Sequence, residues 1–190
     1  NINFQNTTDY GFRYELGLIL SGYRNEVKKL ASNQFISNTY TRTEVGHPIS
    51  SFYGYVIDGI FQTQDEVDSH VEQSDKAIGR WKYRDVNNDG KIDGQDRAYI
   101  GNPHPDFEYS LSSRFYYKNF DLSLYIQGSQ GNDICFASKG GRDGLDFWGD
   151  YFNKSTRILN TWTPENRNAE LPEINILNPN DEAGKVSSYL

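Results

Sequence analysis

The chain has 190 residues, enough for a domain with a sizeable core, and no run of about 18 apolar residues that would predict a transmembrane helix. Its formal net charge of −7 argues against nucleic acid as a partner, because binding phosphates needs basic surfaces. Hydrophobic residues make up only 36% of the chain, yet aromatic residues make up 15%. This combination favours exposed strands and long loops, and the strands of a transmembrane barrel give only a weak hydropathy signal.

Residues 9–24 alternate between apolar side chains and mostly polar or small ones. A period of two predicts a long β-strand with one apolar face. About ten such residues cross a bilayer when the strand is tilted. The apolar face of this strand consists of Tyr10, Phe12, Tyr14, Leu16, Leu18 and Leu20.

Four further elements are predicted before residue 84. Extended pairing is expected around Phe35–Thr43, and the aromatic and β-branched stretch Phe52–Phe61 also predicts extended backbone. Thr63 and Glu66 form a capping box, which predicts a short surface helix ending near Val71. Trp81–Tyr83 then predicts a strand.

The segment that follows has the pattern of a calcium-binding loop. Asp85, Asn87, Asp89 and Gly90 match loop positions 1, 3, 5 and 6 of an EF-hand. Position 7 contributes a backbone carbonyl, and positions 9 and 12 are aspartates. Because an all-oxygen ligand set favours Ca²⁺ over transition metals, we predict a calcium site. Its ligands would be Asp85, Asn87, Asp89, Lys91 through its carbonyl, Asp93 and Asp96.

This loop departs from an EF-hand in two ways. Asp96 stands where a longer glutamate is usual, so weaker binding is expected. The predicted strand before the loop, and Pro103 and Pro105 after it, exclude flanking helices. The alternative is an Asx-turn loop, in which Asn and Asp side chains accept hydrogen bonds from their own backbone and no metal is needed.

Residues 107–128 predict a β-hairpin with a tight turn at Lys118-Asn119. The side chains on its apolar face are aromatic at both ends and aliphatic in the middle, which is typical of a lipid-facing barrel strand. The buried face of a β-sandwich would show the same pattern. The residues concerned are Phe107, Tyr109, Leu111, Phe115 and Tyr117 in the first strand and Phe120, Leu122, Leu124 and Ile126 in the second.

Residues 129–186 predict mostly irregular structure. A segment of this length is unusual inside a compact domain, but fits the long outer loops of a membrane barrel. A short helix is expected over Ser155–Trp162, with Ile158, Leu159 and Trp162 on one side.

The same segment contains candidate substrate contacts. Phe147, Trp148 and Tyr151 offer aromatic faces that stack on sugars. The alternative is that these side chains pack the loop onto the barrel or onto a partner protein.

The sequence indicates no catalytic site. His47, His70 and His104 share no metal-ligand spacing, and Cys135 has no evident histidine partner. The carboxylates lie in loops without a catalytic pattern, and no glycine-rich loop precedes a helix. We therefore expect a protein that is not an enzyme.

Several short sequence motifs, taken in order, span the chain from about residue 9 to its end. They are Glu44–Ile49, Ser51–Tyr55, Asp58–Phe61, Lys82–Asp93, Asp96-Arg97, Ile100–Pro103, Pro105–Phe107, Lys118–Ser123, Gln127–Ile134 and Trp162–Asn166. Together they resemble the SusC/RagA family of TonB-dependent outer-membrane transporters of Bacteroidetes.

The resemblance implies an all-β fold, with antiparallel strands and long loops from a large transmembrane β-barrel and one or two short surface helices. Residues 1–190 would form a C-terminal part of that barrel, without its plug domain and its last strands. The family takes up oligosaccharides or peptides with energy delivered by TonB through the plug. A SusD-like surface lipoprotein covers the barrel, and outer-membrane lipid surrounds it.

Turn length predicts the orientation of such a barrel, because its turns are short in the periplasm and long outside. Lys118-Asn119 would then be periplasmic, and the calcium loop and residues 129–186 extracellular. Two other functions remain open: a secreted, soluble all-β binding module with a calcium loop, and a structural surface protein. Dependence on detergent would separate the importer segment from both.

Overall fold

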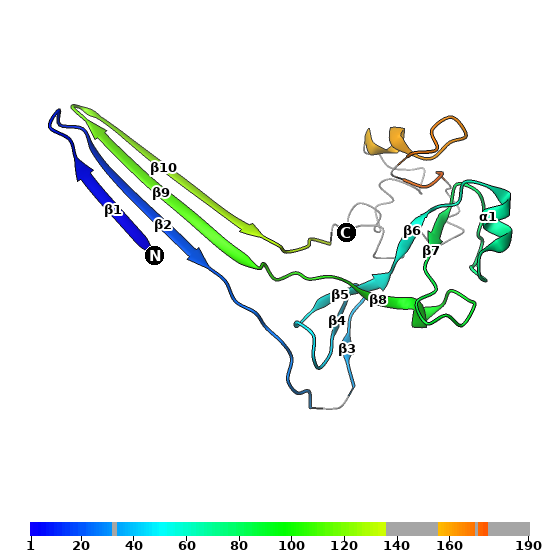
Figure 1. The fold of residues 1–190 in the computed structure, drawn as a ribbon. Helices are drawn as coiled ribbons and strands as arrows, with labels where there is room; N and C mark the ends of the chain where they lie inside the picture. The colour runs from blue at the N-terminus through cyan, green and yellow to red at the C-terminus, as the bar shows by residue number, and fades with distance from the viewer. Residues whose placement is uncertain (32–33, 136–155, 170, 175–190) are drawn as a thin grey trace.

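The structure, a computed structural model, describes residues 1–31, 34–135, 156–169 and 171–174 (Figure 1). Antiparallel strands dominate these residues, and α1 (Gln64–Ser69) is the one α-helix among them. An elongated four-stranded sheet extends away from a second part of the molecule, which carries the shorter strands and α1 (Figure 1). The predicted all-β architecture is therefore confirmed.

The elongated sheet, here called the long sheet, has the strand order β1-β2-β9-β10. Its strands are β1 (Ile2–Thr7), β2 (Arg13–Ser21), β9 (Phe107–Tyr117) and β10 (Phe120–Gln130). The predicted hairpin is confirmed as β9 and β10, although β10 continues two residues beyond the predicted end. Lys118 adopts the positive φ of 53° that this tight turn needs.

The predicted strand over residues 9–24 is shorter in the structure. Thr8 N donates to Phe12 O over 2.8 Å and Gly11 N to Thr8 O over 2.9 Å, so these residues form a turn before β2. Tyr10 lies in that turn and is 89% exposed. The apolar alternation of Tyr10 and Phe12 therefore does not belong to the strand. β1, which the sequence analysis did not predict, pairs with β2 across this turn.

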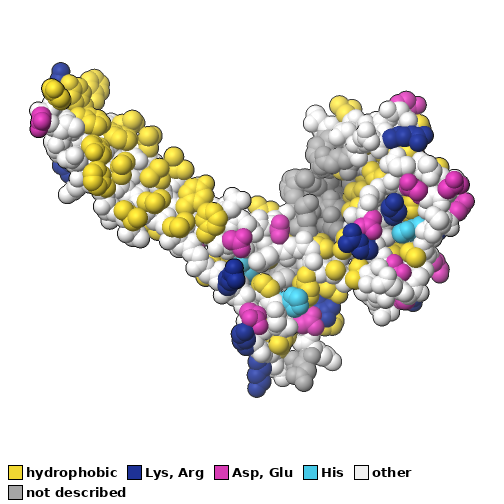
Figure 2. Space-filling model, viewed as in Figure 1, with side chains coloured by type: hydrophobic (Ala, Val, Ile, Leu, Met, Phe, Trp, Pro, Cys, Tyr) yellow, Lys and Arg dark blue, Asp and Glu magenta, His cyan; other side chains and the backbone are white. Residues whose placement is uncertain are grey.

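One face of the long sheet is apolar and exposed, as the hydrophobic side chains along it show (Figure 2). Register produces this face, because Leu18 lies opposite both Ile2 and Leu111 and alternate residues of all four strands follow the same pattern. Aromatic rings gather at its two ends, with centroid distances of 6.2 Å for Phe12–Phe115 and 6.4 Å for Phe107–Tyr109. Exposed apolar faces of this extent mark contact surfaces.

The second part contains two smaller sheets. β3 (Ile36–Ser37), β4 (Thr41–Thr43), β5 (Ser51–Tyr55) and β8 (Arg97–Gly101) form one, in that order. β6 (Ile57–Ile60) pairs with β7 (Trp81–Tyr83) in the other. The pairing predicted around Phe35–Thr43 and the strand predicted at Trp81–Tyr83 are both confirmed. The extended stretch predicted for residues 52–61 is divided between the two sheets at Val56.

The hydrophobic core lies in this second part. Trp81, Tyr83 and Leu171 form a buried cluster, and Phe61 is completely buried nearby. Residues 161–169 and 171–173, late in the chain, close this core. Trp162 N donates to Leu171 O over 2.8 Å, and Glu173 N donates to Gly79 O over 2.8 Å. Here the core depends on residues that are distant in sequence.

The predicted helices are only partly as expected. Thr63 Oγ1 accepts from Glu66 N over 3.2 Å, as the capping box predicts, but the Glu66 carboxylate accepts from Gln62 N over 2.9 Å. α1 ends at Ser69, two residues before the predicted end. The helix predicted over residues 155–162 is the 3₁₀ helix η3 (Thr156–Asn160).

The side predicted for this second helix is wrong. Leu159 is 84% exposed whereas Trp162 is 5% exposed. The reason is that η3 ends at Asn160, and Trp162 follows it in the segment that closes the core.

Gly79 and Gly90 provide a matched pair for testing that closure, since both have positive φ values, of 84° and 87°. A Cβ at residue 79 would lie 2.7 Å from Trp162 Cε3, whereas a Cβ at residue 90 would meet nothing within 4 Å. We expect Gly79→Ala to destabilise the second part by about 1–3 kcal/mol more than Gly90→Ala does. Hydrogen exchange of residues 161–173 measures this difference. Equal protection in the two variants would contradict it.

Candidate functional site

The loop between β7 and β8 folds around its own side-chain oxygens. Asp85 accepts hydrogen bonds from Asp89 N at 3.2 Å and from Gly90 N at 2.9 Å. Asn87 Oδ1 accepts from Asp89 N at 3.0 Å, and Asp89 Oδ1 accepts from Lys91 N at 3.1 Å. These are Asx-type hydrogen bonds that hold the backbone in a tight turn.

Asp96 closes the loop from inside. Its side chain is fully buried, and its Oδ1 accepts from Val86 N over 2.9 Å and from Asn87 N over 3.5 Å. Its Oδ2 accepts from Asp93 N over 2.7 Å, and Asp93 Oδ1 accepts in turn from Gln95 N over 2.8 Å. The two aspartates thus form a capping box on the short 3₁₀ helix η1 (Gly94–Asp96). A buried carboxylate needs such partners, because burying it without them costs several kcal/mol.

Asp93 also pairs with a lysine. Lys91 Nζ lies 3.0 Å from Asp93 Oδ2 on the surface of the loop. The hydrogen bond from Gln95 N, followed by Lys91, lowers the pKa of Asp93, while Asp93 raises the pKa of Lys91. The carboxylate predicted for loop position 9 therefore already has two partners.

The loop geometry bears on the predicted calcium site without testing it. Asp85, Asn87, Asp89, Asp93 and Asp96 all belong to one loop, as predicted. In the described residues their oxygens accept from backbone amides, which is what the Asx-turn alternative expects. No group of three or more His, Cys, Asp or Glu residues in the described ranges is arranged to hold a metal ion. Calcium binding stays a prediction.

The remaining candidate residues do not converge. Phe147, Trp148 and Tyr151, the predicted substrate contacts, lie outside the described residues. His47 stacks on Tyr99 with a centroid distance of 3.8 Å, and the Nδ1 atom of His104 lies 3.2 Å from the hydroxyl of Tyr23. His70 packs edge-on against Phe61, and burial lowers its pKa. The three histidines therefore contact different partners.

Sequence reasoning missed a polar network that joins β4, β5 and β8. The hydroxyl of Tyr99 donates to Glu44 over 2.7 Å, and Arg42 Nε lies 3.0 Å from the same carboxylate. Burial, and then Glu44, raises the pKa of Tyr99, and the hydrogen bond from Tyr99 lowers the pKa of Glu44. The Arg42 guanidinium also lies 3.7 Å from the ring centre of Phe35 and 4.7 Å from that of Tyr53 on β5. These contacts brace three short strands that share few backbone pairs.

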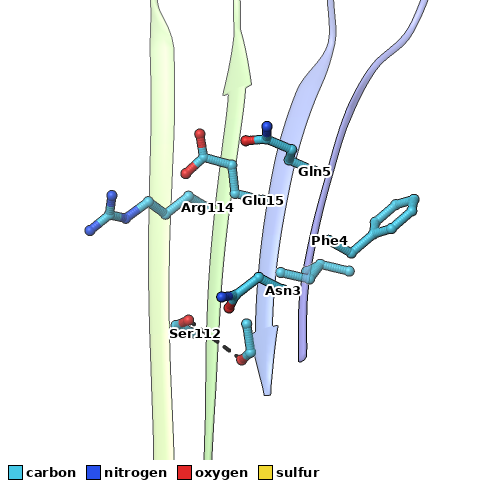
Figure 3. A pocket seen from close by; sticks show the side chains of 8 residues that line it. Asn3, Phe4, Gln5, Glu15, Ser112 and Arg114 are labelled. Atoms are coloured by element: carbon cyan, nitrogen blue, oxygen red, sulfur yellow. Dashed lines mark hydrogen bonds between the residues drawn. The ribbon is translucent and has the colours of Figure 1, made fainter. Parts of the chain in front are cut away.

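A polar hollow of about 540 Å³ lies on the other face of the long sheet (Figure 3). We call it the Gly17 hollow, because a Cβ at residue 17 would lie 2.6 Å from Ser112 Oγ and glycine leaves the space open. The strand alternation could have indicated this polar face, but the missed β1 supplies part of its lining. The polar and small lining residues are Asn3, Gln5, Glu15, Gly17, Ser112 and Arg114.

Asp96 and Asp89 allow the loop structure to be tested. Asp96→Ala removes a fully buried carboxylate and leaves three partly buried amides without their acceptor, so we expect it to destabilise the loop by about 2–4 kcal/mol. Asp89→Ala removes an exposed acceptor and should cost about 1 kcal/mol or less. Hydrogen exchange of residues 84–98 separates the two variants. If Asp96→Ala were as protected as the unmodified chain, the closing role of Asp96 would be wrong.

Among the described residues, no helix is both long enough and apolar enough to cross a membrane. No protein-family model matches the chain. Comparison with curated proteins and with solved structures, in contrast, gives consistent relatives.

The curated relatives are receptors of one kind. The chain is 30% identical over 185 residues to TonB-dependent receptor P26 of Formosa agariphila, covering 90% of this chain and 18% of that protein. It is 28% identical over 183 residues to TonB-dependent receptor P3 of the same organism, again covering 90% and 18%. It is 26% identical over 150 residues to TonB-dependent receptor SusC of Bacteroides thetaiotaomicron, covering 72% and 14%. The chain thus spans less than a fifth of the length of these relatives.

Two solved structures share the fold. The structure of the RagAB peptide transporter matches with a TM-score of 0.59 and 21% identity, covering 90% of this chain and 19% of that chain. The RagAB peptide importer in the open-open state matches with a TM-score of 0.58 and 19% identity, covering 90% and 18%. Both matches include nearly all of this chain.

Proposed function

Because this chain belongs to the TonB-dependent receptors of the SusC/RagA type, we propose that it forms part of the barrel wall of an outer-membrane nutrient importer. The observation that carries the proposal is the exposed apolar face of the long sheet. Membrane barrels present such a face to lipid and a polar face to the lumen.

The dimensions of the long sheet support lipid as the partner of its apolar face. β9 and β10 have 11 residues each, and about 9–11 tilted residues cross the hydrocarbon layer. Leu122, Leu124 and Ile126 are each at least 48% exposed in the middle of the face. Aromatic rings flank these aliphatic residues, as in the girdles of membrane barrels. A soluble module would instead bury this face against a second layer, and the described residues supply none.

Turn lengths support an orientation for the sheet. The turns at residues 8–12 and Lys118-Asn119 lie at one end of the long sheet, and the long connections leave from the other end (Figure 1). Since barrel turns are short in the periplasm, we assign the end with the short turns to the periplasm. The second part, its loop of residues 85–96 and residues 129–186 would then be extracellular.

The activity of the whole protein is proposed from its relatives. We propose uptake of oligosaccharides or peptides, energised by TonB through a plug domain, with a SusD-like lipoprotein on the extracellular side. The name of the RagAB peptide transporter supports the peptide class, and the oligosaccharide class rests on the resemblance to the SusC/RagA family. Phe147, Trp148 and Tyr151 remain the proposed substrate contacts. Transport, rather than catalysis, is the proposed role.

Leu124 and Ser123 test the lipid-facing assignment, since they are neighbours on opposite faces of β10. In the full-length protein, Leu124→Arg should destabilise the barrel by about 2–4 kcal/mol, because Leu124 lies near the centre of β10 and arginine is costly near the middle of the bilayer. Ser123→Arg would point into the lumen and cost much less. Unfolding in lipid vesicles measures both. A chain that is monomeric in plain buffer, with no penalty for Leu124→Arg, would favour the secreted module.

We also propose that residues 85–96 bind Ca²⁺ weakly, which their oxygen ligands and extracellular assignment support. Calorimetric titration of the full-length protein with CaCl₂ should give a dissociation constant of about 10⁻⁴–10⁻³ M, the range of extracellular modules. Asp89→Ala should remove the heat of binding, and Asp68→Ala, on α1, should leave it unchanged. Absence of heat in the unmodified protein, or heat that survives Asp89→Ala, would eliminate the calcium site.

A further inference from the structure

The Gly17 hollow combines charged and uncharged groups from three strands. Gln5, Glu15 and Arg114 lie side by side across β1, β2 and β9, because the registers pair Gln5 with Glu15 and Glu15 with Arg114. The next row along the sheet is formed by Asn3, Gly17 and Ser112. Figure 3 shows Asn3, Gln5, Glu15 and Ser112 bordering the hollow, with the side chain of Arg114 extending from its edge.

The carboxylate of this hollow is already neutralised. Glu15 forms an ion pair with Arg13, whose guanidinium also lies 5.3 Å from the ring centre of Tyr116. The Glu15 side chain is only 26% exposed in this pair. Glu15 is therefore engaged with Arg13 rather than with Arg114, its neighbour across the strands.

The guanidinium of Arg114 remains available. Among the described residues it has no hydrogen-bond or ion-pair partner, although its side chain lines the hollow. Asp121 shares this face, diagonally across from Arg114 on β10, and forms no ion pair within 4.0 Å in the described structure. A guanidinium is a planar fork of donors that matches a carboxylate in bidentate geometry.

We propose that the Gly17 hollow binds a carboxylate group of a transported solute, with Arg114 as its anchor. The amides of Asn3 and Gln5 and the hydroxyl of Ser112 are suited to the neighbouring polar groups of that solute. A monoanion suits the hollow better than a phosphate dianion, because Glu15 lies beside Arg114. The inference rests on the proposed function, which makes this face of the sheet the lumen side.

Protection of Arg114 from chemical modification tests the proposal in the full-length protein in detergent. Phenylglyoxal modifies accessible guanidinium groups, and mass spectrometry follows its rate at each arginine. Glucuronate should slow modification of Arg114 by about tenfold at ten times its dissociation constant, since occupancy follows simple mass action. Glucose, which has a hydroxymethyl group in place of the carboxylate, and NaCl at equal ionic strength should give no protection.

Two substitutions should change the protection of Arg114 by glucuronate in opposite directions. Glu15→Gln removes the neighbouring negative charge and frees Arg13, so less glucuronate should be needed for half-protection, by roughly threefold to tenfold. Arg13→Gln releases Glu15 to pair with Arg114, so protection should be lost. Glu108→Gln is the matched control, because it removes the same charge from the same face six residues away along β9 and should change nothing. General misfolding does not produce opposite shifts.

The outcomes are distinct. Equal protection by glucose or NaCl, or no protection of a reactive Arg114, would overturn the proposal. An Arg114 that is unreactive without solute, and becomes reactive once the plug domain is deleted, would show that another segment of the same protein occupies the hollow, which also overturns it. If this proposal failed, the penalty of Leu124→Arg in lipid would be unaffected, so failure of the proposed function remains distinguishable.

Discussion

Backbone pairing in strict register is the constraint on which the long sheet depends. Four strands pair without a shift, so a side chain two residues further along any strand returns to the same face. A slip of one residue in β10 would exchange Leu122 and Leu124 with Ser123 and Tyr125. One set of backbone hydrogen bonds therefore fixes both the apolar face and the polar hollow. A shift in strand register would disrupt both of them together.

The second part of the molecule is held together differently. Its strands have only two to five residues, so backbone pairing alone supplies little of its stability. Side chains compensate: Tyr99 and Arg42 converge on Glu44, Asp96 accepts hydrogen bonds from partly buried amides, and Trp162 covers Gly79. A buried polar group that loses its partner costs free energy, so Tyr99, Glu44 and Asp96 should be sensitive to replacement.

What the sequence could predict follows from the range of the interactions. The β9–β10 hairpin, α1 and the strand at Trp81–Tyr83 were predicted correctly, because alternation, a turn and a cap are local signals. β1 was missed because only Ile2 and Phe4 mark its apolar face, and Asn6 occupies the next position on it. The turn around Gly11 was missed because the apolar alternation of Tyr10 and Phe12 continues through it. The prediction that Leu159 and Trp162 lie on one side of a helix was wrong because η3 ends before Trp162. Trp162 instead packs against Gly79, about 80 residues earlier in the chain. In the loop of residues 85–96, the sequence showed the pattern of aspartates but could not show that Asp96 is buried.

The pairing of β2 with β9 has a consequence for folding and for how freely the sequence between these strands can vary. Residues 22–106 form a long insertion between two neighbouring strands, and a Cβ at Gly22 would lie only 2.9 Å from Asp106 O, so its two ends are adjacent. Loop-closure entropy grows only logarithmically with length, so a long insertion costs the sheet little more than a short one. Its outer surface can therefore diversify, by substitution or by exchange of the whole insertion, while the pairing of the wall is kept.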